Sequence, residues 1–107
     1  MNTVEPIRSV QSINTIKKLM IADGQYMYHL LFVLGINTGL RISDILSLRY
    51  EDILDSRKRI RKFLNIVEVK TGKQRKVAIN KSVHKAIELL LSNSNKRSGY
   101  LFTKRDN

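Results

Sequence analysis

The pattern of hydrophobic and polar residues in the first half of the chain predicts three helices. The first has apolar residues three or four positions apart, at Val10, Ile13, Ile16 and Met20. Ser9 can cap its N-terminus, and Asp23-Gly24 ends it. A second helix, from about residue 25 to 36, is apolar on nearly every side and is therefore predicted to lie at the centre of the core. A third helix begins near Arg41, after the turn at 37–39.

The second half of the chain predicts a β-hairpin followed by one more helix. Residues 63–69 are rich in strand-forming side chains, 71–74 form a turn, and 75–79 return as the second strand. Ser82 is expected to cap the last helix, whose apolar face contains Val83, Ala86, Ile87, Leu90 and Leu91. The predicted order is α-α-α-β-β-α, a small, mainly helical α+β domain over residues 9–107, preceded by a tail or linker at 1–8.

Composition excludes several classes of protein. The chain has 107 residues, of which 42% are hydrophobic, and no cysteine. A disulfide framework and a thiolate metal site are therefore excluded, and the two histidines lie far apart, which argues against a histidine-based metal site. The longest apolar stretch, 27–40, is too short and too interrupted to span a bilayer. The N-terminus has no secretory signal, which makes the cytoplasm the expected location.

Charge indicates a polyanionic partner. Lysine and arginine number 20 against nine acidic residues, for a net charge of +11. Nucleic acid, either DNA or RNA, is the favoured partner, and a basic RNA-associated protein is one alternative. No helix has the basic and bulky apolar faces that a membrane surface would bind. The candidate phosphate contacts are Arg57, Lys58, Arg59, Arg61, Lys62, Lys73, Arg75 and Lys76. Alternatively, the cations of the hairpin prevent aggregation at a strand edge.

Arg41 is placed where a purely structural residue would rarely be a cation. A guanidinium at a helix start faces the positive end of the helix dipole. Together with free backbone N–H groups, however, it would form a good site for an oxyanion or a phosphate. The alternative is that Arg41 pairs with Asp44 or Asp52 and only orients the turn.

Two stretches of the sequence, NTGLRISDILSLRYEDI and IVEVKTGKQRKVAI, together resemble the N-terminal half of the catalytic domain of tyrosine recombinases, the phage integrase family. The resemblance covers most of the chain, from about residue 4 to 102. It implies that Arg41 is the first catalytic arginine and that Lys70, in the hairpin turn, is the catalytic lysine. Asp44 matches the acidic residue that braces the arginine region. The order and separation of the two motifs also fit the family.

This resemblance implies DNA integration or recombination by a protein of a phage or other mobile element, without metal or cofactor. A tyrosine attacks a backbone phosphate and forms a 3′-phosphotyrosyl link. Arg41 would hold the non-bridging oxygens, where negative charge grows, and Lys70 would protonate the departing 5′ oxygen. The implied partners are double-stranded DNA and other recombinase protomers.

The chain departs from the family pattern in its second half. No His-x-x-Arg element is present, because His84 is followed by Lys-Ala-Ile and is interpreted as a surface or capping residue. Tyr100 lies in SGYLFTK, well before the place of the family's nucleophile, and the other tyrosines, Tyr26, Tyr28 and Tyr50, are interpreted as packing residues. We therefore expect a partial catalytic domain that does not cut DNA by itself, with apolar surface exposed around residues 32–36. The alternative is a non-catalytic DNA-binding module or regulator derived from a recombinase.

Overall fold

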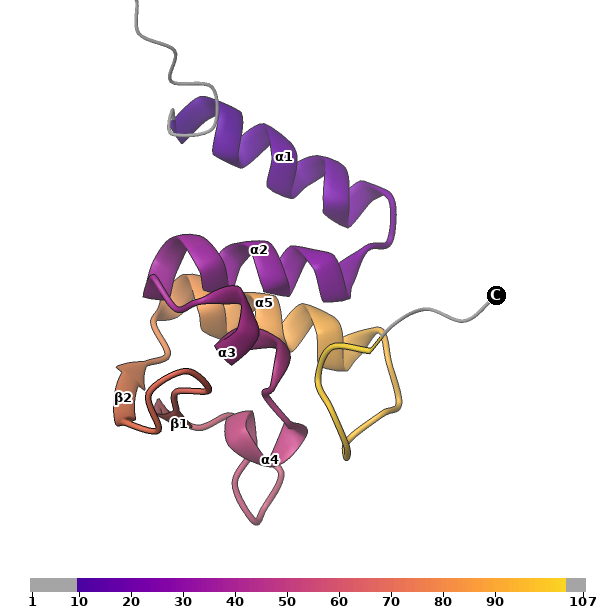
Figure 1. Cartoon of the computed structure of the whole chain (residues 1–107). Helices are drawn as coiled ribbons and strands as arrows, with labels where there is room; N and C mark the ends of the chain where they lie inside the picture. Colours follow the sequence, from indigo (N-terminus) through magenta and orange to yellow (C-terminus); the bar gives the residue numbers. More distant parts are fainter. Residues whose placement is uncertain (1–9, 104–107) are drawn as a thin grey trace, which may run out of the picture.

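The computed structural model describes residues 10–103 and has, within that range, five helices and one two-stranded antiparallel sheet (Figure 1). The α+β class predicted from the sequence is confirmed. The predicted tail at 1–8 and the cap at Ser9 lie outside the described residues. The elements in chain order are α1 Val10–Ala22, α2 Tyr26–Thr38, α3 Ile42–Leu46, α4 Tyr50–Ile53, β1 Phe63–Val67, β2 Gln74–Ala78 and α5 Lys81–Ser92.

Helix α2 is the centre of the core, as its apolar sequence predicts. It packs against α1 on one side and α5 on the other (Figure 1). Leu30, Val33 and Leu34 are fully buried, and the predicted apolar face of α5 is buried through residues such as Ile87. Burying these side chains supplies about 1.5–3 kcal/mol each, so the α2–α5 contact is a major source of stability for the whole unit.

The hairpin has one buried and one exposed face. Leu64 and Ile66 of β1 point inward, whereas Phe63, Asn65 and Val67 point outward, as the two-residue period of a strand requires. The two strands pair in register from Phe63 with Ala78 to Val67 with Gln74. The prediction that the first strand reaches residue 69 is wrong, because pairing ends at residue 67 and residues 68–73 form the turn.

The N-cap of α5 differs from the prediction. Asn80, not Ser82, caps this helix: its Oδ1 accepts a 2.9 Å hydrogen bond from the N–H of Val83. Asn80 has an extended backbone, so its side chain can reach the first turn, whereas Ser82 is already inside the helix. The Asn80 Nδ2 also donates to Oδ1 of Asn37 at 2.9 Å. The cap therefore joins the start of α5 to the end of α2.

Helix α4 was not predicted. It has only four residues, too few for a helical period to be recognised. The carboxylate of Asp52 accepts a 2.7 Å hydrogen bond from the N–H of Arg49 and so satisfies one free donor at the helix start. Tyr50 and Ile53 are buried and attach this turn to the core.

Candidate functional site

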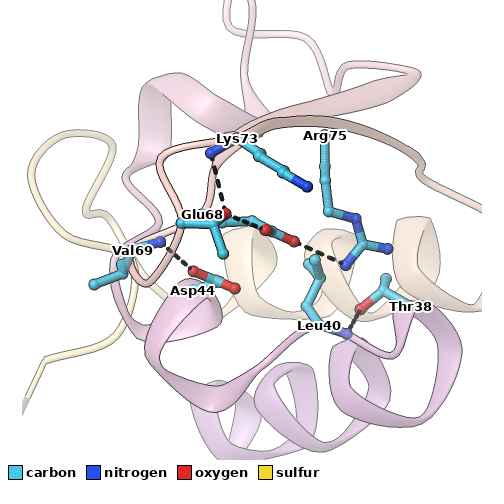
Figure 2. Close-up of polar contacts among 8 residues, drawn as sticks. Thr38, Leu40, Asp44, Glu68, Val69, Lys73 and Arg75 are labelled. Atoms are coloured by element: carbon cyan, nitrogen blue, oxygen red, sulfur yellow. Dashed lines mark hydrogen bonds and ion pairs between the residues drawn. The ribbon is translucent and has the colours of Figure 1, made fainter.

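The turn between α2 and α3 places Arg41. Gly39 has a φ of 69°, a left-handed conformation that glycine adopts at little cost, and its N–H donates to the carbonyl of Gly35. The hydroxyl of Thr38 donates to the carbonyl of Leu34. The same hydroxyl accepts from the N–H of Leu40 (Figure 2). Leu40 itself is buried. The chain therefore leaves α2 in one fixed direction, with Arg41 as its next residue.

The backbone of Arg41 is fixed while its side chain is exposed. Its carbonyl accepts hydrogen bonds from the N–H groups of Asp44 and Ile45 at 3.0 and 3.1 Å. The alternative that Arg41 pairs with Asp44 or Asp52 is wrong: the side chain of Arg41 makes no ion pair within residues 10–103, and both carboxylates bind backbone N–H groups elsewhere. Because α3 has only five residues, its dipole adds little, and an anion at this helix start would be held mainly by the exposed guanidinium.

Asp44 links α3 to the hairpin turn. Its side chain is 1% exposed, and Oδ1 accepts a 2.8 Å hydrogen bond from the N–H of Val69 (Figure 2). Oδ2 is buried and has no partner in the described part of the chain. Val69 immediately precedes Lys70, and Arg41 lies one helical turn before Asp44. This one bond therefore joins the backbone segments that carry Arg41 and Lys70.

Glu68 organises the turn between β1 and β2. Its N–H donates to the carbonyl of Lys73 and its own carbonyl accepts from the N–H of Gly72, both at 2.8 Å. Its carboxylate accepts a 2.6 Å hydrogen bond from the hydroxyl of Thr71 and pairs with the guanidinium of Arg75 at 3.6 Å (Figure 2 shows this pair). The turn is thus internally bonded at both ends, which fixes the path of the backbone at Lys70.

Lys70 and Lys73 project from this ordered turn into solvent. Both side chains are exposed, and neither has an ion-pair partner among the described residues. Arg75, which the sequence placed among the phosphate contacts, is paired with Glu68 in the free chain. The arrangement therefore presents a fixed cation, Arg41, and titratable lysines on neighbouring segments. Such a set can bind a phosphate and deliver a proton to it.

The basic run that follows α4 forms a short hairpin of its own. Leu54 and Ile60 pair as an isolated bridge, and the carboxylate of Asp55 accepts from the N–H groups of Arg57 and Arg59 at 2.8 and 2.9 Å. The hydrogen bonds from these two N–H groups lower the pKa of Asp55, and the bond from Arg59 has the larger effect. The run is therefore a turn built around one carboxylate, and its tip carries Arg57, Lys58 and Arg59.

The remaining candidate cations have different surroundings. Arg61 donates from Nε to the carbonyls of Glu51 and Leu54, each at 3.1 Å, so its side chain stabilises the end of α4. Lys62 is exposed, and the ammonium of Lys76 lies 4.5 Å from the centre of the Phe63 ring. The candidate cations thus divide between the β1–β2 turn and the region of the short hairpin.

Tyr100 has a structural contact. Its ring lies 4.2 Å from the guanidinium of Arg49, and the backbones of the two residues form a bridge. This contact, which sequence reasoning missed, attaches the 93–100 loop to the start of α4.

Tyr50 packs in the core as predicted, and burial raises the pKa of its hydroxyl. Tyr28 is 46% exposed, so it packs only in part. Tyr26 is half-buried.

The two histidines differ in environment. His84 is on the surface, as predicted, and its Nδ1 lies 3.6 Å from the carboxylate of Glu88. His29 is buried, and its Nδ1 has no partner within residues 10–103. Burial lowers the pKa of His29, and the charge of Lys17 lowers it further. Burial at this position therefore favours the neutral form of His29 in the folded chain.

The expected apolar surface is present where α1, α2 and α3 meet. A hollow of about 320 Å³ is lined by Met20, Tyr28, Leu31, Phe32, Gly35, Ile36 and Ile42. Ile36 is 44% exposed, as the sequence predicted for residues 32–36.

Among the described helices, none is long and apolar enough to cross a membrane. Among the same described residues, no group of three or more histidine, aspartate or glutamate side chains lies close enough together to hold a metal ion.

Comparisons with known proteins agree with the family resemblance of the two sequence stretches that contain Arg41 and Lys70. The profile of the phage integrase family matches residues 8–107. The "Probable integrase/recombinase YoeC" of Bacillus subtilis (strain 168) is 38% identical over 87 residues, which cover 81% of this chain and 45% of that protein. No significant match to a solved structure was found. The chain belongs to the phage integrase family, and it spans less than half the length of the curated relative that it matches.

Proposed function

We propose that this chain is the part of a site-specific tyrosine recombinase that holds the scissile phosphate of double-stranded DNA. In this proposal, residues 9–107 form a partial catalytic domain. The observation that carries the proposal is the hydrogen bond between Asp44 and Val69, which joins the segments of Arg41 and Lys70. Family membership supports the same assignment. Its proposed process is DNA integration or recombination by a phage or other mobile element. A DNA substrate is consistent with a cytoplasmic location and with assembly of further recombinase protomers on the DNA.

In the proposed reaction, a tyrosine oxygen attacks the phosphorus and forms a 3′-phosphotyrosyl bond while the bond to the 5′ oxygen breaks. Arg41 binds the non-bridging oxygens, on which negative charge increases, and its fixed charge suits that role. The Lys70 ammonium donates its proton to the 5′ oxygen as that oxygen leaves. Asp44 acts as a positioning residue, because it holds the backbone next to Lys70.

The attacking tyrosine is not assigned to any described residue. Tyr100 contacts Arg49, and Tyr50 is buried. We therefore expect the chain to form no covalent adduct with a nicked suicide oligonucleotide, as measured by the mass of the protein after incubation. A stable increase in mass by one DNA strand that disappears in Tyr100→Phe would contradict this assignment.

Binding measurements test the roles of Arg41 and Lys70 in the chain itself. Arg41→Ala should weaken binding to a labelled duplex, because a direct phosphate contact is lost. Lys70→Ala should change affinity by less than about twofold, since a proton donor contributes to the rate more than to binding. If Lys70→Ala instead weakens binding as much as Arg57→Ala combined with Arg59→Ala, Lys70 is a simple phosphate contact and a non-catalytic DNA-binding module is the better account.

The proton-donor role is tested in the complete recombinase of which we propose this segment is a part. Lys70→Ala should slow strand cleavage by about 10²–10⁴-fold. A substrate with sulfur in place of the bridging 5′ oxygen should restore the rate, because a thiolate leaves without a proton. Arg41→Ala should not be rescued by the same sulfur. Equal rescue of both variants, or of neither, would contradict the separate roles.

A further inference from the structure

Strand β2 forms an edge of the sheet. Within residues 10–103 the sheet has two strands, and β2 pairs with β1. Helix α4 packs against β1, whereas Figure 1 shows β2 farther out, to the left of β1. The backbone N–H and C=O groups on the outer side of an edge strand are free to pair with another chain.

Two hydrogen bonds just beyond the ends of the ladder fix which residues of β2 bond to β1. The N–H of Glu68 donates to the carbonyl of Lys73, and the N–H of Ile79 donates to the carbonyl of Lys62. In an antiparallel ladder, hydrogen-bonded pairs alternate with non-bonded pairs. Counting along the register from either end, residues 75 and 77 are the ones whose backbone groups bond to β1.

The alternate residues of β2 therefore direct their backbone groups away from β1. These residues are Gln74, Lys76 and Ala78, and all three are exposed. Their N–H and C=O groups have no hydrogen-bond partner in the part of the chain that the structure describes. We call these three residues the open edge of β2.

Positive charge protects the open edge from a second copy of the chain. If two β2 strands paired antiparallel, a register centred on residue 76 would place Lys76 opposite Lys76. A register centred on residue 75 would place Arg75 opposite Arg75. Like charges directly opposite each other destabilise a pair of strands, and the net charge of +11 adds general repulsion. A second copy is therefore a poor partner for this edge.

The same side chains favour an acidic strand. Lys76 has no ion-pair partner among residues 10–103, so a carboxylate on an added strand beside it gains an opposite charge. Ala78 is small and pairs in the register with Phe63, whose ring is 43% exposed. An apolar side chain beside Ala78 can therefore reach this ring. Because side chains alternate along a strand, the acidic and apolar residues must lie two positions apart.

We propose that the open edge of β2 binds an extended acidic segment of a second protein, which adds to the sheet as a third strand. The outward backbone groups of Gln74, Lys76 and Ala78 supply the main-chain hydrogen bonds. Specificity comes from a carboxylate opposite Lys76 and an apolar side chain opposite Ala78. The inference goes beyond the proposed function, because it uses the edge of the sheet and neither Arg41 nor Lys70.

Titration of the full chain with a fluorescent synthetic peptide, Thr-Val-Thr-Asp-Thr-Asp-Thr, tests this binding. With the peptide at about ten times its Kd, amide hydrogen exchange at Gln74, Lys76 and Ala78 should slow by about tenfold. The amides of Arg75 and Val77, which already bond to β1, should change much less. The control is the same peptide with methyl groups on the backbone nitrogens of its valine and both aspartates. It keeps the charge but loses the donors that face β2, and should bind at least about tenfold more weakly.

Variants of the chain test the two parts of the recognition separately. Lys76→Glu should weaken binding of the acidic peptide and favour one with lysine in place of aspartate. Lys85→Glu, on the exposed side of α5, makes the same change in net charge and should have a smaller effect. Ala78→Pro removes one outward N–H, at an edge position that tolerates proline, and should also weaken binding. Far-UV circular dichroism checks folding, and Lys76→Gln replaces Lys76→Glu if that variant does not fold.

Three results would overturn the inference. Equal binding of the methylated and unmethylated peptides would show that charge alone attracts them. Equal weakening by Lys76→Glu and Lys85→Glu would show that the contact is not at the edge. Absence of binding by the unmethylated peptide would remove the site altogether. None of these results bears on the proposed function, which is tested by the effect of Arg41→Ala on DNA binding.

Discussion

The carboxylate of Asp44 on α3 accepts a 2.8 Å hydrogen bond from the backbone N–H of Val69, which lies 25 residues later in the chain. The bond connects a buried side chain to a turn that is otherwise held by its own contacts through Glu68. Because Arg41 and Lys70 lie on the two joined segments, the bond sets the arrangement on which the proposed chemistry depends.

Removing this acceptor should loosen the turn. We expect Asp44→Ala to lower the free energy of unfolding by about 2 kcal/mol, the usual range for a hydrogen bond to a charged group. Hydrogen exchange at the Val69 amide should become faster, whereas Asp44→Asn, which keeps an acceptor, should protect it. Ser43→Ala, an exposed neighbour on α3, is the control. An equally protected Val69 amide in Asp44→Ala would show that the bond does not hold the turn.

His29 makes the stability of the chain depend on pH. Burial lowers its pKa below the ordinary value of 6.5, so the unfolded chain takes up a proton before the folded one does. The contribution of neutral His29 is complete above pH 6.5 and is lost as the pH falls through the lowered pKa. The free energy of unfolding should therefore decrease over that interval. His29→Leu should remove this part of the decrease and His84→Gln should not; the reverse result would assign it to His84.

Much of the fold could be predicted from the sequence because periodicity reports burial directly. The all-round apolar α2 and the one-sided α5 each bury the residues that their patterns indicate, such as Val33 and Ile87. The two motif segments were also found from sequence, since Gly39 and the 68–73 turn have local signals. By contrast, α4 is too short for any period, and only the structure reveals it.

The partners of charged side chains could not be predicted in the same way. Arg61 and Arg75 look like Lys62 in the sequence, yet one binds carbonyls at the end of α4 and the other pairs with Glu68. Such contacts depend on how distant segments meet. The contact between Asp44 and Val69 also crosses two elements, and no local pattern indicates it.

The cap of α5 offers a direct comparison of two neighbouring residues. Asn80→Ala should lower the free energy of unfolding by about 1 kcal/mol, because the first turn loses its side-chain acceptor. Ser82→Ala should change it by less than about 0.5 kcal/mol, as is usual for an exposed position without such a contact. Chemical denaturation of both variants measures the difference. A larger effect of Ser82→Ala would show that Ser82, as the sequence suggested, caps this helix.

The left-handed backbone at Lys58 should carry a measurable cost. Lys58→Gly should be more stable than Lys58→Ala by about 1 kcal/mol, since glycine has no side chain to strain in that conformation. Both variants lose the same charge, so their affinities for duplex DNA should fall together. Thermal unfolding and binding measured on the same two proteins check this. Equal stability of the pair would mean that the backbone at residue 58 is not strained.

The arrangement of Arg41 and Lys70 around one phosphate is tested most directly by nuclear magnetic resonance of the chain during titration with duplex DNA. The account predicts that the Nε–H signal of Arg41 and the side-chain signals of Lys70 change together as DNA is added. In Asp44→Ala, the Lys70 response should weaken while the Arg41 response persists. If DNA shifts only the signals of the short basic hairpin at 54–60 and leaves Arg41 and Lys70 unchanged, the chain binds DNA but does not hold a phosphate between these two residues, and the central claim is wrong.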